Sequence, residues 1–248
     1  MQSRGYFANI SQQYAAGRPT YPSAMFEFLC NKSPGLDRAW DCATGSGQAA
    51  SQLTGRMRYV VATDISINQL DCLPDQQSMS ALACSAETSP FRSESFDLVT
   101  VGQALHWFHL DAFFEEANRV LKPGGLLAVW CYGACTTSPA VDALYWQLYD
   151  RQLGEYWPPG RELVDQSYGT IAFPYQRIET PVFAMEQHWS AQQYMAYLAS
   201  WSAVDRYKQS HGKDPLPDFE NALLSVWEEG VTQKITWPIV MLAGFKPG

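Results

Sequence analysis

Short apolar runs alternate with helix-like stretches along the first half of the chain. The runs have the length of buried strands and lie at residues 39–43, 59–63, 80–84, 96–101 and 126–131. Helices are predicted between them, at residues 46–55, at residues 66–73 and behind Asp111. Because near-continuously apolar strands alternate with helices, the pattern predicts an α/β fold whose parallel sheet is covered on both faces.

Two helix starts carry capping signals. Asp111 is predicted as an N-cap, and the helix behind it places on one face Phe113, Phe114, Ala117, Val120 and Leu121. Pro123-Gly124-Gly125 is expected to end that helix. Ser190 and Gln193 have the spacing of a capping box, followed at helical spacing by Tyr194, Leu198, Trp201 and Val204. Two further strands are predicted, at residues 177–188 and 237–245.

Composition excludes several classes of protein. Hydrophobic residues make up 46% of the chain, enough for a full core. The net charge is −8 with no block of Lys or Arg, which disfavours a nucleic-acid partner. No run of 18 apolar residues or signal-peptide core occurs, so we expect no membrane partner.

The cysteines do not suggest a metal site. The six cysteines form no Cys-x-x-Cys pair and have no histidine cluster beside them. Several lie in apolar runs, where a free thiol packs as a small hydrophobic group. Reduced, structural cysteines are typical of a cytoplasmic protein, and that location is our expectation.

The strand at residues 39–43 leads into Gly45-x-Gly47-x-x-Ala50, a candidate nucleotide-binding turn. Glycines let the backbone approach a ligand, and the following helix offers free amides. Asp64 ends the next strand and can accept hydrogen bonds from ribose hydroxyls. These features suit NAD, but they equally suit another ligand built on adenosine.

Three details argue against NAD. Asp41 lies inside the strand before the turn, where a carboxylate repels a pyrophosphate but suits an ammonium or sulfonium. Ser85–Phe91 follows the third strand and can frame the edge of an adenine. Residues 118–125, NRVLKPGG, precede the fifth strand.

The motifs, in their order, resemble the class I S-adenosylmethionine-dependent methyltransferases over roughly residues 38–132. They are Asp41-x-Ala43-x-Gly45-x-Gly47, Asp64, Ala86-Glu87-x-x-Pro90-Phe91, Phe96-Asp97-x-Val99 and Arg119-Val120-Leu121-Lys122-Pro123-Gly124-Gly125. The opening Tyr14-x-x-x-Arg18-Pro19-x-Tyr21-Pro22 and the segment Ala104–Phe108 resemble the small-molecule branch that includes trans-aconitate-type methyltransferases.

This resemblance implies a Rossmann-like, mostly parallel seven-stranded sheet with an antiparallel last strand and helical lid insertions. It implies S-adenosyl-L-methionine as cofactor and S-adenosyl-L-homocysteine as product. We expect a single domain, 1–248, with its core at residues 30–135, 176–188 and 236–246. Residues 1–29, 136–175 and 189–235 would form a cap on the acceptor side.

The resemblance also assigns residues to the cofactor. The turn residues Ala43, Thr44, Gly45, Ser46 and Gly47 would line its methionine part, with Gln103 and Ala104 beneath. Asp64 would take the ribose, and the adenine would lie among Ile65, Ser85, Ala86 and Glu87. Tyr14 and Arg18 would fold over the site. The family often has glycine at the position of Ala43 and an acidic residue near Ser85.

His106 is the candidate catalytic residue, either as a base or as a side chain that orients the acceptor. Candidate substrate-binding residues are aromatic: Trp107, Trp130, Tyr132, Trp189, Tyr197 and Trp201. Few cations accompany them, which favours a small planar or hydrophobic O-, N- or carboxyl acceptor, as in secondary metabolism, over a polyacid. The alternatives are an NAD-dependent oxidoreductase and a non-methylating cyclase that binds S-adenosylmethionine. Either a monomer or a homodimer is compatible with the sequence.

Overall fold

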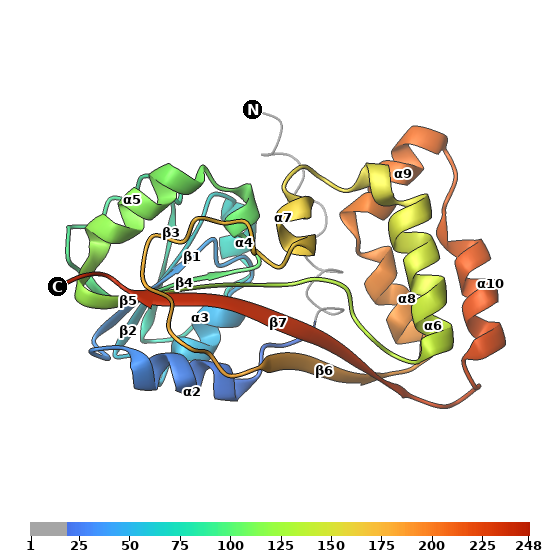
Figure 1. Cartoon of the computed structure of the whole chain (residues 1–248), viewed down its shortest axis with the longest axis horizontal. Coiled ribbons are helices and arrows are strands. Elements are labelled where there is room, and N and C mark those ends of the chain that lie inside the picture. Colours follow the sequence, from blue (N-terminus) through green and yellow to red (C-terminus); the bar gives the residue numbers. More distant parts are fainter. Residues whose placement is uncertain (1–18) are drawn as a thin grey trace.

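The computed structural model describes residues 19–248, so the predictions for Tyr14 and Arg18 lie outside the described residues. Its centre is a seven-stranded sheet in the order β3-β2-β1-β4-β5-β7-β6 (Figure 1). The strands are β1 Arg38–Cys42, β2 Tyr59–Asp64, β3 Met79–Ala83, β4 Phe96–Gly102, β5 Leu121–Tyr132, β6 Phe183–Trp189 and β7 Gln233–Phe245.

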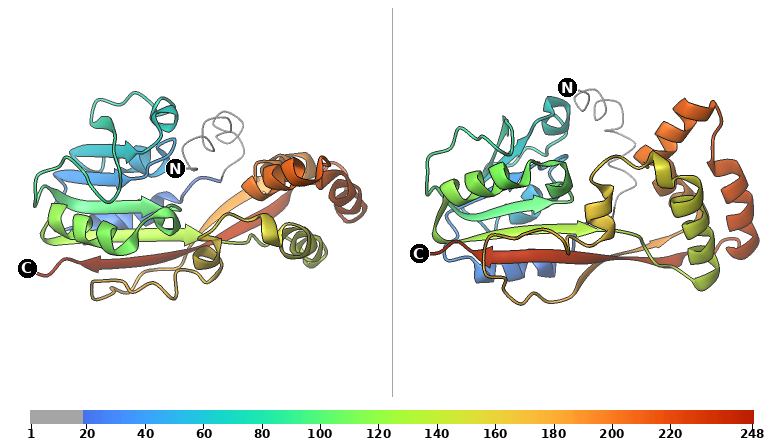
Figure 2. Two further views of the ribbon diagram at one scale, coloured as in Figure 1. Left: turned by 90° about the horizontal axis from the view of Figure 1, so that it is seen from above. Right: turned by 45° about the horizontal axis from the view of Figure 1, so that its top comes forward.

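Only β7 runs against the other strands. The pairs among β1 to β5 are parallel, whereas β7 is antiparallel to both β5 and β6. The predicted mostly parallel, Rossmann-like sheet with an antiparallel last strand is therefore confirmed. β7 pairs with β5 through its carboxyl-terminal half and with β6 through its amino-terminal half, so it links the sheet to the far end of the molecule (Figure 2).

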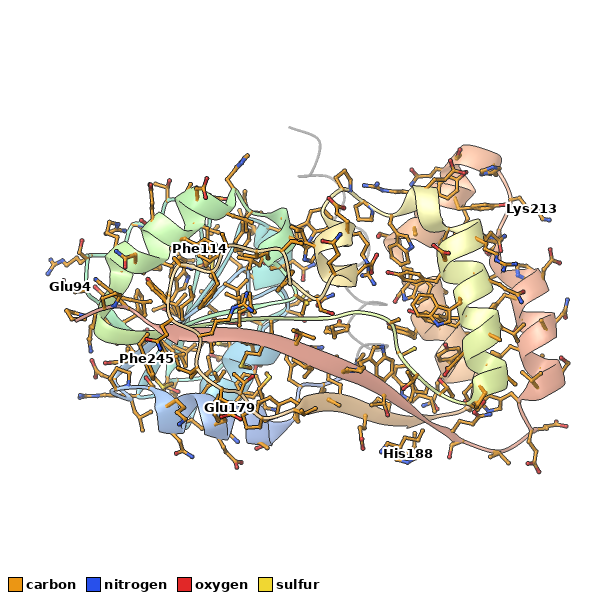
Figure 3. The ribbon with its side chains drawn as sticks, in the orientation of Figure 1. Glu94, Phe114, Glu179, His188, Lys213 and Phe245 are labelled. Carbon is orange, nitrogen blue, oxygen red and sulfur yellow. The ribbon has the colours of Figure 1, made fainter. Side chains whose placement is uncertain are left out.

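Helices cover both faces of the sheet. On one face lie α2 (Ser23–Lys32) and α3 (Gln48–Leu53), whose apolar side chains share a core cluster with Leu98 and Leu126. On the other face α5 (Leu110–Val120) packs in a second cluster with Val99 and Leu127. Figure 3 shows Phe114 of α5 pointing into the layer between helix and sheet. A short helix, α4 (Ile67–Leu70), follows β2.

A group of helices stands beyond the end of the sheet (Figures 1 and 2). It contains α6 (Pro139–Trp146), the π-helical turns η2 (Gln147–Gln152), η3 (Gly154–Tyr156), α8 (Ala191–Ala199), α9 (Ser202–His211) and α10 (Leu216–Val226). Two short helices, η1 (Leu105–Trp107) and α7 (Arg161–Asp165), lie between this group and the sheet.

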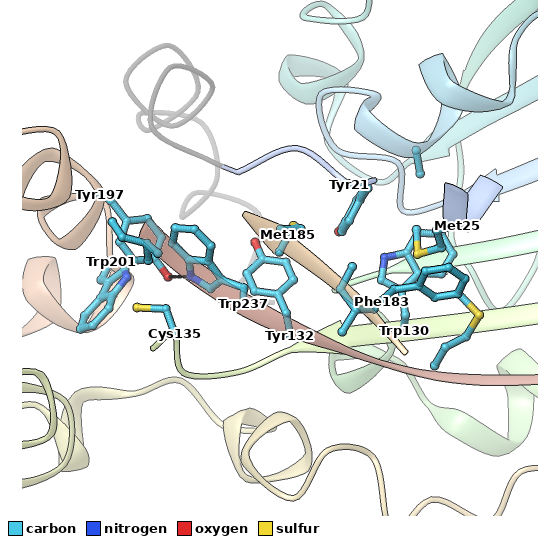
Figure 4. Close-up of a cluster of buried hydrophobic side chains, with 14 of the residues drawn as sticks. Tyr21, Met25, Trp130, Tyr132, Cys135, Phe183, Met185, Tyr197, Trp201 and Trp237 are labelled. Atoms are coloured by element: carbon cyan, nitrogen blue, oxygen red, sulfur yellow. Dashed lines mark hydrogen bonds between the residues drawn. The ribbon is translucent and has the colours of Figure 1, made fainter. Parts of the chain in front are cut away.

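One hydrophobic core runs from the sheet into the helical group. Figure 4 shows Trp130 and Phe183 at the sheet end of this cluster and Trp201 at the other end. The indole Nε1 of Trp237 donates to the hydroxyl of Tyr197 over 3.1 Å. The helical group is thus packed onto the sheet through buried side chains.

Several predicted boundaries were wrong. α5 begins at Leu110 with His109 as its N-cap, and Asp111 makes no cap hydrogen bond because it already lies in the first turn. β5 begins at Leu121, because that residue pairs with Phe96, so Pro123-Gly124-Gly125 lies inside the strand. β6 begins at Phe183 instead of residue 177.

The helix behind Ser190 was predicted in part. Its capping box with Gln193 is confirmed. The helix ends at Ala199, however, and Trp201 is the N-cap of the next helix, α9. The apolar stripe therefore spans two helices, and its buried positions persist because both helices face the same core.

Parts of the segments assigned to the cap belong to the layers on the sheet. Residues 23–29 lie in α2, where Met25, Phe26 and Leu29 are fully buried under the sheet. Within the insertion 136–175, Val164 and Tyr168 join the cluster beneath α5. The core around the sheet therefore takes up more of the chain than its strands suggest.

Candidate functional site

A cavity of about 390 Å³ opens where the carboxyl ends of β1, β2 and β4 meet the helical group. One part of its wall comes from the ends of these strands and of β3 and from the loops that follow, and includes Gly45, Asp64 and Ala86. The other part is aromatic and includes Tyr145, Trp157 and Trp201. Loops at the carboxyl ends of parallel strands are the usual ligand site of such sheets.

The turn after β1 adopts left-handed backbone conformations. Ala43, Gly45 and Gly47 have φ angles of 52°, 57° and 83°, which only glycine adopts without strain. Thr44 anchors the turn, since its amide donates to the carbonyl of Thr63 over 2.8 Å. Of the turn residues assigned to the methionine part of the cofactor, Ala43, Thr44, Gly45 and Ser46 line the cavity.

Gly47 does not line the cavity, contrary to the expectation for it. It is the N-cap of α3, and a Cβ there would collide with the side chain of Leu73. The positive φ favours a glycine at this position, whatever the space around it.

Asp41 is buried beneath the turn, with 1% of its surface exposed. Its Oδ2 accepts from the Ala50 amide (3.0 Å) and from Thr44 Oγ1 (2.6 Å), while Oδ1 accepts from Thr100 Oγ1 (2.7 Å). Burial raises the pKa of this carboxyl to about 6. The residue holds the turn against the start of α3 and does not reach the cavity wall, so it has no contact there with a cationic ligand group.

Asp64 lies on the wall at the end of β2. Its Oδ2 accepts from the Gly45 amide over 3.0 Å and its Oδ1 from the Ser66 amide over 2.8 Å. Partial burial raises the pKa of the carboxyl. The next residue, Ile65, is 58% exposed beside the cavity, an open apolar surface next to a carboxylate.

The loop after β3 brings Ser85, Ala86 and Glu87 to the same part of the wall. Ser85 donates a short hydrogen bond to the carboxylate of Glu87, and the His109 amide donates to it over 3.1 Å. Burial opposes the charge, but these donors lower the pKa of Glu87. The wall therefore carries an ionised carboxylate close to Ser85.

Gln103 and Ala104 continue the wall beyond β4. Gln103 has a φ of 54°, and its side-chain amide pairs with the backbone of Tyr132. Nε2 donates to the Tyr132 carbonyl over 3.0 Å, and Oε1 accepts from the Tyr132 amide over 2.8 Å. The Gln103 side chain therefore continues the hydrogen bonding between β4 and β5 beyond the end of β4. It also fixes the backbone of Tyr132 beside the cavity.

His106 lies on the wall in η1. Its Nδ1 is 3.1 Å from the hydroxyl of the buried Tyr168. Gly160, with a φ of 88°, packs so close to the His106 carbonyl that a Cβ would collide with it. Trp107 follows His106 and is 43% exposed.

The aromatic wall differs from the set predicted from the sequence. Trp107, Tyr132, Tyr197 and Trp201 line the cavity. Trp130 does not, because it points to the α2 face of the sheet, where its ring packs edge-on against Tyr21 and Phe26. Trp189 packs in the core against Trp237 and behind Tyr197, so it too lies off the wall.

Comparisons with known proteins agree with this geometry. A family model described as a methyltransferase domain matches residues 40–129. A solved protein from Anaeromyxobacter dehalogenans, assigned as a type II methyltransferase, superimposes with a TM-score of 0.87 at 35% identity. That match covers 93% of this chain and 98% of the other. The chain belongs to the class I S-adenosylmethionine-dependent methyltransferases.

One further relative is named for the same activity, and a more distant solved structure shares the fold alone. A Dictyostelium discoideum protein named as a methyltransferase is 29% identical over 97% of this chain and 94% of its own length. A Haemonchus contortus N-methyltransferase, solved with phosphomonomethylethanolamine and S-adenosylhomocysteine, shares the fold at 16% identity and a TM-score of 0.52. It covers all of this chain and is covered over 61% of its own.

The cofactor of this methyltransferase is therefore S-adenosylmethionine, and the NAD-dependent oxidoreductase alternative is wrong. Asp41 gives the physical reason. Its carboxylate accepts from an amide at the start of α3, where a dinucleotide fold would place a pyrophosphate. The wall beside this turn carries the carboxylate of Asp64 and the exposed side chain of Ile65.

Some wall residues of the methyltransferase were not predicted from the sequence. They are Tyr21, Gln48, Ala49, Gln69, Cys84, Gly102, Phe108, Gly133, Tyr145, Trp157, Pro158, Arg161, Ser200 and Ser202. Cys84 and Gly102 end strands that were predicted, so they could have been found from strand position. Those from the helical group carry no local signal.

No group of three His, Cys, Asp or Glu side chains that could hold a metal occurs among residues 19–248. None of the described helices has both the length and the apolar composition to cross a membrane.

Proposed function

We propose that this methyltransferase methylates a small molecule with a flat or apolar body, bound against the aromatic wall. The observation that carries the proposal is the continuity of one cavity. Its strand-end part, with Gly45 and Asp64, and its aromatic part, with Tyr145 and Trp201, share a single space. A methyl donor bound in the strand-end part would face a methyl acceptor bound in the aromatic part.

At the strand ends, each residue has a proposed contact with the cofactor. Asp64 would accept from the ribose hydroxyls, because its carboxylate lies on the wall and a carboxylate oxygen that receives a backbone amide can accept a further hydrogen bond. Ile65 would cover one adenine face. Ala43, Thr44, Gly45 and Ser46 would line the methionine part, above Gln103 and Ala104.

Glu87 would take the place of the acidic residue that the family often has near Ser85. The carboxylate of Glu87 receives hydrogen bonds from Ser85 and from the His109 amide. An ionised carboxylate suits the adenine amino group as a hydrogen-bond acceptor. Glu116 would support this loop from behind, since it accepts from the Ser89 amide over 2.8 Å and pairs with Arg119 over 2.7 Å.

When bound, S-adenosylmethionine supplies a methyl carbon on a positive sulfur, which an acceptor lone pair takes as the carbon–sulfur bond breaks. The chain then needs mainly to align the acceptor, and orientation of reactants accounts for roughly 7–11 kcal/mol in favourable cases. Trp107, Tyr132 and Tyr197 would provide that alignment. His106 would orient the acceptor or take its proton where it has one to lose.

The test is turnover with S-adenosylmethionine and two panels of acceptors, followed by mass spectrometry. One panel contains hydroxylated one- and two-ring aromatic compounds, and the other contains di- and tricarboxylic aliphatic acids of the trans-aconitate type. We expect methylated products from the aromatic panel only. Exclusive turnover of the polyacids would contradict the proposal, and rearranged products without a methyl gain would favour the cyclase.

A further inference from the structure

Arg161 brings a positive charge to the aromatic part of the cavity. It is the first residue of α7 and lies on the wall beside Trp157. Its side chain is 18% exposed. Among the described residues that line the cavity, it is the only Arg or Lys.

The guanidinium is held from one side. Its Nε donates to Tyr149 Oη over 2.7 Å and to Asp165 Oδ1 over 3.2 Å. Its central carbon lies 4.7 Å from the ring centroid of Trp157 and 5.3 Å from that of Tyr149. Tyr149 is itself fixed, because its hydroxyl donates to Asp165 over 2.6 Å. These contacts leave little freedom in the position of the guanidinium.

The outer nitrogens of Arg161 remain available. Within residues 19–248, Nη1 and Nη2 make no hydrogen bond to another side chain or to the backbone, and neither is a buried, unsatisfied atom. Two parallel N–H groups on a planar guanidinium match the two oxygens of a carboxylate. Burial works against the charge, but Tyr149 and Asp165 raise the pKa of Arg161, so it stays cationic.

The carboxylates of the wall lie at the other end of the cavity. Asp64 ends β2 and Glu87 is on the loop after β3, whereas Arg161 belongs to the part of the wall with Tyr145, Trp157 and Trp201. An acceptor with one negative group would therefore place it at Arg161 and its rings against the aromatic side chains. A polyacid would leave its further charges among rings without a partner, which is costly.

We infer that Arg161 determines acceptor specificity by binding a single carboxylate on a one- or two-ring aromatic acceptor. This inference rests on the proposed function, because it specifies the acceptor of the same cavity. The backbones around Arg161 and His106 lie close together, since a Cβ on Gly160, the neighbour of Arg161, would meet the His106 carbonyl. The carboxylate serves as the anchor that orients the ring toward His106.

The experiment compares two probes of equal shape, 6-hydroxy-2-naphthoate and 6-hydroxy-2-naphthamide. Each is titrated into the protein saturated with S-adenosylhomocysteine, and binding is followed by calorimetry. We expect the acid to bind about tenfold to a hundredfold more tightly than the amide, as for a hydrogen-bonded charge. In Arg161→Gln this preference should disappear while the affinity for the amide changes less than about twofold.

Two controls separate the role of Arg161 from general effects. Arg151→Gln removes an exposed arginine on η2 that does not line the cavity, and the preference for the acid should survive. Arg161→Lys keeps the positive charge but loses the two parallel N–H groups of the guanidinium. This variant should keep only part of the preference for the acid over the amide.

The possible outcomes distinguish this inference from the proposed function. Equal binding of acid and amide, binding of neither, or a preference that persists in Arg161→Gln would overturn the inference. In each of these cases S-adenosylhomocysteine binding and methylation of neutral aromatic compounds would leave the proposed function standing. Failure of all aromatic turnover would refute both.

Discussion

The hydroxyl of Tyr168 lies 3.1 Å from Nδ1 of His106, and this contact sets how the imidazole stands on the cavity wall. Tyr168 is fully buried and has a φ of 54°, so the surrounding core fixes its ring. The hydroxyl comes from an insertion 62 residues away in sequence. His106 therefore depends on α7 and the segment behind it for its orientation.

We predict that Tyr168→Phe lowers kcat by about 2- to 10-fold, because one hydrogen bond of roughly 0.5–1.5 kcal/mol is lost. The affinity for S-adenosylmethionine should not change. Tyr175→Phe is the matched control, since its hydroxyl bonds Asn118 far from the cavity wall. Equal kinetics for the wild type and Tyr168→Phe would show that this contact does not orient His106.

Replacement of His106 by glutamine tests what the side chain does. If His106 orients the acceptor, as we expect, kcat falls while any pH-dependent limb of the rate survives. A base would instead show a pH-dependent limb in the wild type that is lost in the variant. The pH profile of kcat in the two proteins decides between these roles.

We expect Asp64→Asn to weaken the binding of S-adenosylmethionine by about tenfold to a hundredfold, because a charged acceptor is lost from the ribose position. Isothermal titration calorimetry measures the change. Asp71→Asn removes an exposed carboxylate at the end of α4 and should have no effect. Unchanged affinity in Asp64→Asn, with unfolding temperatures matched, would reject the ribose assignment.

Ala43→Gly should stabilise the fold. Ala43 has a φ of 52°, and a left-handed alanine costs roughly 1–2 kcal/mol. Relief of this strain exceeds the added entropy of an unfolded glycine, so the free energy of unfolding should rise by about 0.5–1 kcal/mol. In contrast, Ala112→Gly inside α5 should lower it by about 1 kcal/mol. Urea unfolding measures both, and a loss of stability in Ala43→Gly would contradict the strain.

The buried Asp41 should make stability depend on pH. Its pKa of about 6 in the folded chain exceeds its unfolded value of about 3.9. The folded state therefore takes up this proton more readily, and stability is gained as the pH falls through 6. Asp41→Asn lacks this gain. We expect the stability of the wild type relative to the variant to rise by about 2–3 kcal/mol between about pH 7 and pH 4. If the difference in the free energy of unfolding between the wild type and Asp41→Asn did not change with pH, the raised pKa of Asp41 would be contradicted.

The strands and the turn after β1 were predictable because their signals are local. An apolar run, a glycine turn and an acidic residue at the next strand end identify Ala43, Gly45 and Asp64 from sequence alone. The capping box at Ser190 is equally local, since it needs two side chains and one helix start.

The aromatic wall was less predictable because residues on the same face of a strand can differ in whether a helix covers them. Trp130 and Tyr132 lie two residues apart on β5, and both belong to the core cluster on the α2 side of the sheet. Trp130 packs beneath Tyr21 and Phe26, whereas Tyr132, at the end of the strand, reaches the cavity. Arg161 and Trp157 were missed because only the tertiary packing of the helical group brings them to the wall.

The turn around Asp41 has a consequence for how the site recognises its ligand. The negative charge at the start of α3 is supplied by the protein itself and is already bonded to Thr44, Thr100 and the Ala50 amide. The cradle is thus preorganised before any ligand arrives. Because this amide of α3 is already bonded to a carboxylate of the protein, it is not free to receive a phosphate, and the start of α3 differs in this from the anion sites that other helix starts form.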